Sequence, residues 1–282
     1  MASAPRPAPR HLAALLVLGV TLATFAHTLG FQFVAWDDGI TIYQNPSLGP
    51  LSLERVAWAF TDVATTMRWI PLTLLSLSLT HTFHGLDPFG YHLANWLIHG
   101  ATALLLFLAL LELLGPEARR RGEAPGGPWV LASAAAGALA WALHPLRVEV
   151  VAWSNSRDHA QASLFAVLAL LVYLRTHRPE APSARPLAGS ALAAGCYLLA
   201  LTSHPVVLGL APVFLLLDVH LGRLGGAAGW WGPGPRRVLL EKLPFAAAAA
   251  LVLLVTVLVR TFASGRWPAP VPLSEWGVFA RA

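Results

Sequence analysis

The sequence predicts an all-α polytopic membrane protein, and two observations support this prediction. Only 12% of the 282 residues are charged, 56% are hydrophobic, and the mean hydropathy is +0.60. Soluble globular chains carry about 25% charged residues, so roughly half of the usual charge is missing. Long apolar runs also recur along the chain, as a membrane-embedded helical bundle requires. We therefore exclude a disordered chain, an ordinary cytosolic enzyme and a nucleic-acid-binding domain, and expect no nucleic-acid partner.

About seven apolar runs are the candidate transmembrane helices. A helix that crosses the bilayer needs about 20 apolar residues. The first run, 12–29, follows Arg6 and Arg10, and a cleaved signal peptide is its alternative. The other runs, several of them short, are 91–114, 129–143, 159–174, 187–202, 206–221 and 243–262. We treat residues 1–282 as one membrane-embedded domain with no soluble repeat domain.

Two further segments are predicted to be helical without crossing the membrane. Residues 71–84 are apolar but carry several polar side chains, so we interpret them as a partly embedded helix. Residues 53–60 place apolar side chains at i, i+3, i+4 and i+7, and Ser52 can cap them. This short helix lies either in the membrane interface or against the spans.

The distribution of basic residues predicts the orientation. Cytoplasmic loops are enriched in Lys and Arg, and a cytoplasmic N-terminus places most of the 19 basic residues on the inner side. The first extracytoplasmic segment is then 31–90, the second is the loop 144–158, and the turn at 203–205 also faces outward. The inner loops are typical of plain connectors.

Asp37 and Asp38 form the first polar group on the predicted outer side. Adjacent carboxylates beside a membrane are costly unless they are solvated or used. They suit proton abstraction, a hydroxyl clamp or a divalent cation. The alternative is a solvated loop start in which Asp38 and Gly39 form a turn.

The densest polar group lies in residues 144–159. The guanidinium groups of Arg147 and Arg157 match phosphate oxygens, and His144 or His159 can bind phosphate or pass a proton. A loop held by structural ion pairs is the alternative. The candidate substrate-binding residues in this segment are His144, Glu149, Arg157 and Asp158.

Two further histidines are candidates for binding a lipid phosphate or a sugar. His204 lies in an outer turn, where a structural role is its alternative. His92 shares a helical stripe with Asn95 and His99, which either binds a substrate head group or joins helices by hydrogen bonds. No metal-ligand spacing such as HExxH occurs, so no metal site is predicted, although a divalent ion is compatible with the acidic pair.

Several motifs, taken in order, resemble a known family. The most specific is HPLRVEVVAW at 144–153, with Arg157 and Asp158 beyond it. The others are FVAWDD at 33–38, NP at 45–46, WIPLT at 69–73, GLDPFGYHLAN at 85–95, ALTSHP at 200–205, FLLLD at 214–218 and EKLPF at 241–245. Together they resemble the membrane domain of the transmembrane and tetratricopeptide-repeat O-mannosyltransferases and their bacterial relatives.

This resemblance implies a GT-C-like fold, similar to that of protein O-mannosyltransferases. It implies a glycosyltransferase that moves a sugar, in the family mannose, from a polyprenyl-phosphate donor to an acceptor hydroxyl, here a protein Ser or Thr. The family uses acidic residues of the first outer loop near the acceptor, so Asp37 and Asp38 are the catalytic candidates. The expected partners are membrane lipid, the polyprenyl-phosphate sugar and an acceptor protein or glycan, with no cofactor besides the donor. The expected location is the bacterial inner membrane.

The chain departs from the family pattern in three ways. Family members usually show Val-His-Thr where Leu146, Arg147 and Val148 stand, and often Lys where His204 stands. Their membrane domain has more spans, and many members add tetratricopeptide repeats. We therefore expect the chain to be incomplete at its C-terminus, in which case it could be inactive.

Two alternative functions stay open at this point. One is a non-catalytic membrane protein, such as a transporter or an assembly partner. Transporters place ionisable groups at mid-bilayer, whereas the charges here cluster at one surface. The other is a transferase of the same fold that acts on a lipid or a cell-wall glycan.

Overall fold

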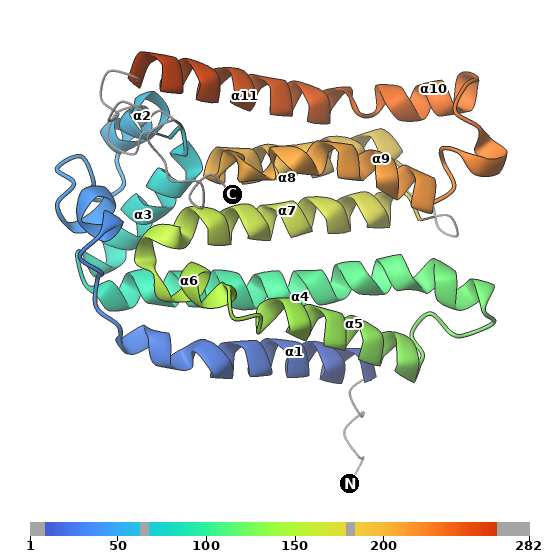
Figure 1. Ribbon diagram of the computed structural model, residues 1–282, viewed down its shortest axis with the longest axis horizontal. Helices are drawn as coiled ribbons and strands as arrows, with labels where there is room; N and C mark the ends of the chain where they lie inside the picture. Colours follow the sequence, from blue (N-terminus) through green and yellow to red (C-terminus); the bar gives the residue numbers. More distant parts are fainter. Residues whose placement is uncertain (1–8, 63–67, 179–183, 264–282) are drawn as a thin grey trace, which may run out of the picture.

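The computed structural model describes residues 9–62, 68–178 and 184–263 and confirms the all-α architecture (Figure 1). Some predictions fall outside the described residues. They concern Arg6, residues 63–67 of the first predicted outer segment, and the C-terminal residues after 263. Within the described ranges, an isolated bridge between Gly225 and Gly229 is the only β pairing.

The elements are α-helices and short 3-10 helices, except η2, which is a π turn. In chain order they are α1 (Pro9–Phe25), η1 (Ala26–Gly30), η2 (Gly39–Tyr43), α2 (Leu53–Thr61), α3 (Pro71–His84), α4 (Pro88–Arg120), α5 (Pro128–Ala142), α6 (Arg147–Ala152), η3 (Ser154–Ser156), α7 (Arg157–Thr176), α8 (Pro186–Ser203), η4 (Pro205–Leu210), α9 (Ala211–His220), η5 (Gly226–Ala228), α10 (Pro233–Leu240) and α11 (Leu243–Ala263).

Among the described residues, five segments are long and apolar enough to cross a membrane, so the chain is a multi-pass membrane protein. They are Pro9–Gly30, Pro88–Arg120, Ser154–Thr176, Pro186–Ser203 and Pro233–Val259. Pro128–Ala142 and Pro205–His220 are apolar but shorter. The predicted runs therefore correspond to five full-length candidates and two short ones.

Prolines and capping side chains fix where several helices begin. Proline occupies the first turn of α3, α4, α5 and α8, where its missing N–H costs no hydrogen bond. Asp87 caps α4 by accepting a hydrogen bond from the Phe89 amide at 3.0 Å. Ser52 Oγ accepts from the Arg55 amide at 3.2 Å, which confirms the cap predicted for α2.

The sequence left open whether the helix α2 lies in the membrane interface or packs against the spans, and the structure shows features of both. Its Ala59 is fully buried and clusters with Ile70 and Leu74 at the start of α3. Leu53 and Phe60, in contrast, are 89% and 50% exposed. One face of α2 thus packs on the protein, and these apolar side chains stay open to its surroundings.

Two buried clusters hold the bundle together. Between α1, α4 and α5 the cluster is rich in alanine, including Ala103, Ala134 and Ala138. Small residues let helices approach closely in lipid, where association depends on packing contacts. Between α7, α8, α9 and α11 the cluster is aromatic, and Tyr173, Tyr197, Phe214 and Phe245 lie within it.

The spans alternate in direction, so the polar motifs gather at one end of the bundle (Figure 1). We call this end, formed by residues 31–62, 84–88, 143–158 and 204, the motif end. The segment 144–158 was predicted as a loop, but the structure folds it into α6, η3 and the start of α7. Residues 147–152 lack Pro and Gly, which explains the helical turn after Pro145. The opposite end carries the loops 121–127 and 221–232.

Candidate active site

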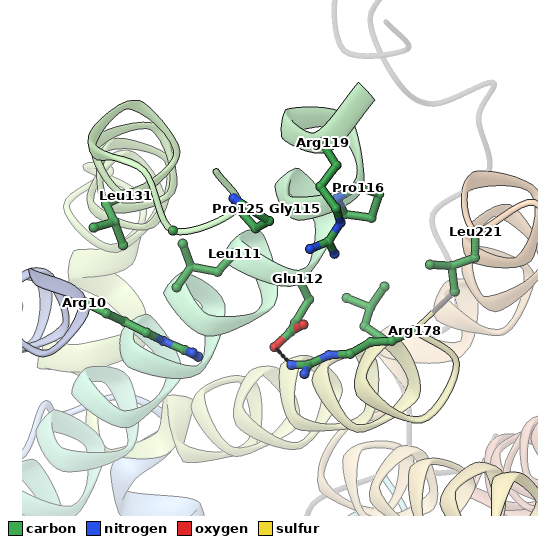
Figure 2. A pocket seen from close by; sticks show the side chains of 12 residues that line it. Arg10, Leu111, Glu112, Gly115, Pro116, Arg119, Pro125, Leu131, Arg178 and Leu221 are labelled. Atoms are coloured by element: carbon green, nitrogen blue, oxygen red, sulfur yellow. Dashed lines mark hydrogen bonds and ion pairs between the residues drawn. The ribbon is translucent and has the colours of Figure 1, made fainter. Parts of the chain in front are cut away.

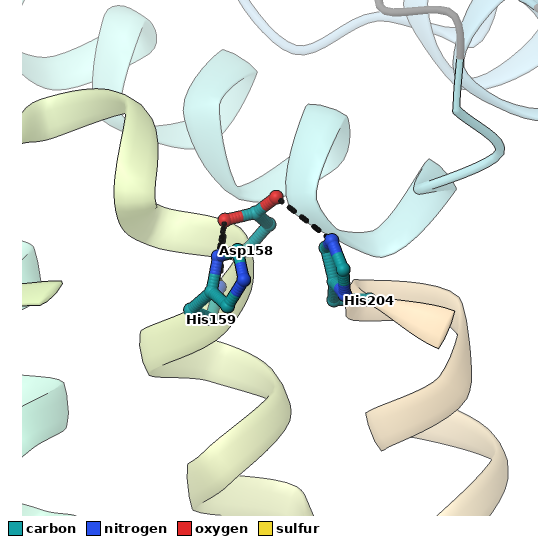
Figure 3. A group of neighbouring side chains, drawn as sticks. All are labelled: Asp158, His159 and His204. Carbon is teal, nitrogen blue, oxygen red and sulfur yellow. Dashed lines mark hydrogen bonds and ion pairs between the residues drawn. The ribbon is translucent and has the colours of Figure 1, made fainter. Parts of the chain in front are cut away.

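The carboxylate of Asp158, at the start of α7, is the centre of a polar cluster at the motif end (Figure 3). The side chain is 4% exposed. Oδ1 lies 2.7 Å from His159 Nδ1 and also accepts a hydrogen bond from the His159 amide. Oδ2 lies 3.3 Å from Arg68 Nη1 and 3.7 Å from His204 Nε2. One buried anion therefore gathers one guanidinium and two imidazoles.

The hydrogen bonds fix which imidazole nitrogens carry protons. His204 Nδ1 accepts a hydrogen bond from the Val206 amide at 3.0 Å, so the neutral ring carries its proton on Nε2, which faces Asp158. Burial lowers the pKa of His204 to about 4, which keeps this ring neutral at pH 7. His159 Nδ1 faces the Asp158 carboxylate and donates to it, so in the neutral ring Nε2 holds the lone pair.

This cluster borders a cavity of about 260 Å³ between the starts of α3 and α7, the turn before η4, and α11. Its lining combines cationic, imidazole and apolar groups: Arg68, Trp69, His159, His204, Pro205, Thr256 and Val259. The centroids of the two imidazole rings lie 4.3 Å apart. Such a lining suits an anionic group that is attached to an apolar chain.

Asp158, His159 and His204 are also the described residues that could hold a metal ion, since one ligand atom from each lies within 4.8 Å of the others. The hydrogen-bond pattern opposes this use. His204 Nδ1 accepts a hydrogen bond from the Val206 amide, so the neutral ring has no lone pair on Nε2, and metal coordination requires a nitrogen lone pair. We therefore derive no chemical step from a metal ion, and the predicted lack of a metal site stays a prediction.

Arg157 lies next to Asp158 in sequence but points into the bundle. It is 1% exposed. Its Nη2 donates to the Tyr91 carbonyl at 2.9 Å, Nη1 donates to Thr80 Oγ1 at 3.3 Å, and Nε donates to Asn95 Oδ1. These bonds tie α7 to α3 and α4. The predicted contact of Arg157 with substrate stays a prediction, and its geometry favours a positioning role.

Asp38 joins the two outer motifs that the sequence predicted to share one face. It is fully buried. Its Oδ2 accepts a hydrogen bond from the Val34 amide, and its Oδ1 accepts one from the Asn155 amide, both at 2.9 Å. Burial raises the pKa of Asp38 despite these bonds. Asp37 takes no part in the two bonds and is only partly buried, so it is the more accessible carboxylate of the pair.

His92, Asn95 and His99, which form one stripe of α4, make hydrogen bonds to neighbouring segments. This is the structural role that the sequence left open for them. His92 is fully buried, with Nε2 3.4 Å from Ser154 Oγ. Asn95 Nδ2 donates to the Trp153 carbonyl at 3.0 Å, and His99 Nε2 lies 3.0 Å from the Ala142 carbonyl. The predicted substrate contact of His92 is not tested by these bonds.

His144 and Glu149 lie on the exposed flank of the segment 144–158, outside the cavity lining. The cavity lining includes the predicted His204, and it includes His159, whose imidazole the sequence offered for binding phosphate or passing a proton, but Arg68 was not predicted as a site residue. Arg68 nevertheless had a signal in the sequence, because it directly precedes the WIPLT motif. Thr256 and Val259 lie in a plain apolar run that carried no such signal.

A second buried ionic network lies towards the opposite end, between α7, α9 and the α10–α11 junction. Asp218 is fully buried and pairs with Arg223 at 2.6 Å and with Lys242 at 2.9 Å. Arg223 also pairs with Glu241 at 2.5 Å. Tyr173 Oη donates to Asp218 at 2.7 Å. The charges compensate one another, so the network holds the helix ends together.

Comparisons with known proteins find relatives for most of the chain. It is 31% identical over 219 residues to "Protein O-mannosyl-transferase TMTC2" of Homo sapiens, covering 74% of this chain and 24% of that protein. It is 27% identical over 172 residues to "Protein O-mannosyl-transferase TMTC3" of Homo sapiens, covering 58% and 17%. With "Protein O-mannosyl-transferase Tmtc1" of Drosophila melanogaster it shares 33% over 158 residues, covering 54% and 17%. The chain thus spans about a quarter or less of the length of these relatives. No family model and no solved structure matches it.

Proposed function

Because the chain belongs to the family of the transmembrane and tetratricopeptide-repeat O-mannosyltransferases, we propose that it is a membrane glycosyltransferase. The donor in this proposal is a polyprenyl-phosphate sugar, mannose, and the acceptor is a Ser or Thr hydroxyl of a protein. The reaction takes place at the outer face of a bacterial inner membrane, with the N-terminus in the cytoplasm. The observation that carries the proposal is the cavity bordered by Arg68, His159 and His204.

The cavity supplies the two features that a lipid-phosphate donor needs. Arg68 presents guanidinium N–H donors on one side, and Asp158 restrains both Arg68 and His159 through its two carboxylate oxygens. Residues of α11, including Thr256 and Val259, form another part of the lining. The donor phosphate lies against the guanidinium, and its isoprenoid chain leaves along α11 towards the lipid.

The transfer step combines this placement with a general base, for which we propose the accessible carboxylate of Asp37. The acceptor oxygen attacks the anomeric carbon of the sugar, and the bond between that carbon and the phosphate oxygen breaks. Asp37 takes the proton of the acceptor hydroxyl as general base. The departing polyprenyl phosphate gains negative charge, which Arg68 stabilises because its guanidinium is already oriented before the reaction. Attack from the face opposite to the phosphate inverts the anomeric configuration.

Transfer of radiolabelled mannose from polyprenyl-phosphate mannose, in membranes that contain the full chain, tests this function. The acceptors are a Ser/Thr-rich peptide and, in separate assays, membrane lipid and cell-wall glycan. Replacing Arg68 by Gln removes the charge that faces the leaving phosphate, and we expect about a 100-fold loss of transfer rate. The matched control, Arg120→Gln, removes an exposed arginine at the opposite end and retains activity.

Equal transfer by Arg68→Gln and the unaltered chain would exclude the phosphate role of the cavity. Complete absence of transfer by the unaltered chain with all three acceptors, in membranes where relatives are active, would exclude the transferase function itself. Transfer to lipid or glycan alone would keep the enzyme class and replace the acceptor.

A further inference from the structure

We propose that a second cavity, at the end opposite to the motif end, binds a phosphate group carried by an anionic phospholipid or present as a soluble phosphate. The cavity has a volume of about 290 Å³. Its walls come from α1, α4, α5 and the end of α7. Leu221, which follows α9, and Pro125 and Gly126 of the loop before α5 complete the lining. About 30 Å of α4 separates Glu112 in this cavity from His92 at the motif end. The inference is therefore independent of the transfer reaction.

Three arginines from separate parts of the chain line this one cavity (Figure 2). Arg10 comes from α1, Arg119 from α4, and Arg178 from the segment after α7. Figure 2 shows their guanidinium groups turned towards a common space, with Glu112 between them. Arginines that only set the membrane orientation need to lie on the inner side, but they need not converge on a cavity.

The single carboxylate does not neutralise this lining. Glu112 Oε1 accepts hydrogen bonds from Arg178 and, at 3.3 Å, from Arg175, which lies outside the cavity. Three guanidinium groups and one carboxylate thus leave the lining net positive. Arg178 Nε is buried and has no hydrogen-bond partner among the described residues. A buried donor without an acceptor is costly, and a bound phosphate oxygen would satisfy it.

The chemistry of the lining suits a phosphate group on an apolar molecule. The planar fork of arginine pairs with two phosphate oxygens at once. The rest of the lining is largely apolar, including Leu111, Leu131 and Leu174, which suits the glycerol and the first acyl carbons of a phospholipid. Basic pockets between transmembrane helices on the cytoplasmic side bind anionic lipid head groups in this way, and the sequence predicts that this end faces the cytoplasm.

Retention of phosphatidylglycerol by the full chain, measured by native mass spectrometry at increasing lipid concentration, tests the lipid source. Arg10→Gln/Arg178→Gln should weaken retention by about tenfold or more, because it removes two of the three guanidinium groups that would hydrogen-bond the phosphate directly. The matched control, Arg120→Gln/Arg121→Gln, removes two exposed arginines of the same end that do not line this cavity. It should change retention by no more than about twofold.

A second arm tests the soluble source. The chain in phosphatidylcholine nanodiscs is titrated with inorganic phosphate, and the unfolding temperature is recorded. A rise in unfolding temperature that is lost in Arg10→Gln/Arg178→Gln assigns the site to soluble phosphate, and retention of phosphatidylglycerol without such a rise assigns it to lipid.

If the double variant does not fold, Arg10→Gln alone decides, because Arg10 is exposed. About a fivefold loss of phosphatidylglycerol retention is then expected. Equal losses in the cavity and control variants, or no response in either arm, would overturn the proposal.

Discussion

Arg157 and Asp158 divide two tasks between adjacent positions of α7. Successive residues on a helix point about 100° apart, so Arg157 turns into the bundle and Asp158 turns to the cavity. The guanidinium of Arg157 is satisfied by neutral acceptors on α3 and α4. The carboxylate of Asp158 restrains Arg68, His159 and His204. The carboxylate of Asp158 therefore positions the cavity residues, although Asp158 does not itself line the cavity.

His177, which is buried at the end opposite to the motif end, should make the stability of the protein depend on pH. Burial and the nearby Arg223 lower the pKa of His177 to about 4, whereas an unfolded histidine has its pKa near 6.5. The unfolded chain therefore binds more protons between these values, and the stability contributed by neutral His177 is lost as pH falls from 6.5 towards 4. Each kcal/mol lost lowers Tm by about 2–4 °C.

Thermal unfolding of the purified chain between pH 7.5 and 4.5 measures this loss. His177→Gln keeps a polar group for Ser190, whose Oγ lies 2.9 Å from His177 Nε2, and it should flatten the fall in Tm. His11→Gln removes an exposed histidine of α1 and should leave the fall unchanged. Parallel pH curves for His177→Gln and the unaltered chain would show that other groups control the transition.

At the level of elements, close approach of α7 and α8 depends on a glycine. A Cβ at Gly189 would meet Oγ1 and Cγ2 of Thr176 far inside contact distance and Thr176 Cβ at 2.9 Å. Because Thr176 belongs to the last turn of α7, its backbone cannot move away without separating the two helices. Gly189→Ala is expected to destabilise the protein by about 1–3 kcal/mol.

Gly195 on the same helix is the matched control. A Cβ there meets nothing within 4 Å, and alanine favours a helix over glycine by about 0.5–1 kcal/mol. Gly195→Ala should therefore raise Tm while Gly189→Ala lowers it, in thermal unfolding of the detergent-solubilised chain. If both substitutions shift Tm in the same direction, packing between α7 and α8 does not limit stability at Gly189.

The elements themselves were largely predictable, whereas the cavity at the motif end was not. Apolar length identifies a span without knowledge of its neighbours, and Ser52 identifies the start of α2 in the same way. Arg68 and His204 are far from Asp158 in sequence, so their convergence depends on how α3, α7 and α8 pack. The sequence also could not distinguish Asp38, which is buried against Asn155, from its accessible neighbour Asp37.

At the level of the whole molecule, the bundle places two polar cavities at its opposite ends. The cavity at the motif end combines an arginine with imidazoles beside a buried carboxylate, whereas the second cavity presents three arginines. The proposed transfer reaction needs the first site on the outer side, and lipid binding by basic cavities is typical of the inner side. Both assignments therefore depend on one orientation of the chain.

Cysteine labelling of intact cells tests that orientation. The single native cysteine, Cys196, is buried and is first replaced by alanine. Single cysteines then replace Trp36 and Leu146, which are 72% and 66% exposed at the motif end, and Arg121 at the opposite end. A membrane-impermeant thiol reagent should label positions 36 and 146 in intact cells and position 121 only after permeabilisation, because the Lys and Arg bias places the latter inside.

Labelling of 121 alone would keep the fold and reverse the orientation of the chain in the membrane, which would exclude transfer at the outer face. Labelling of only one of 36 and 146 would mean that the two motifs lie on different sides of the membrane, which the hydrogen bond from Asn155 to Asp38 does not allow.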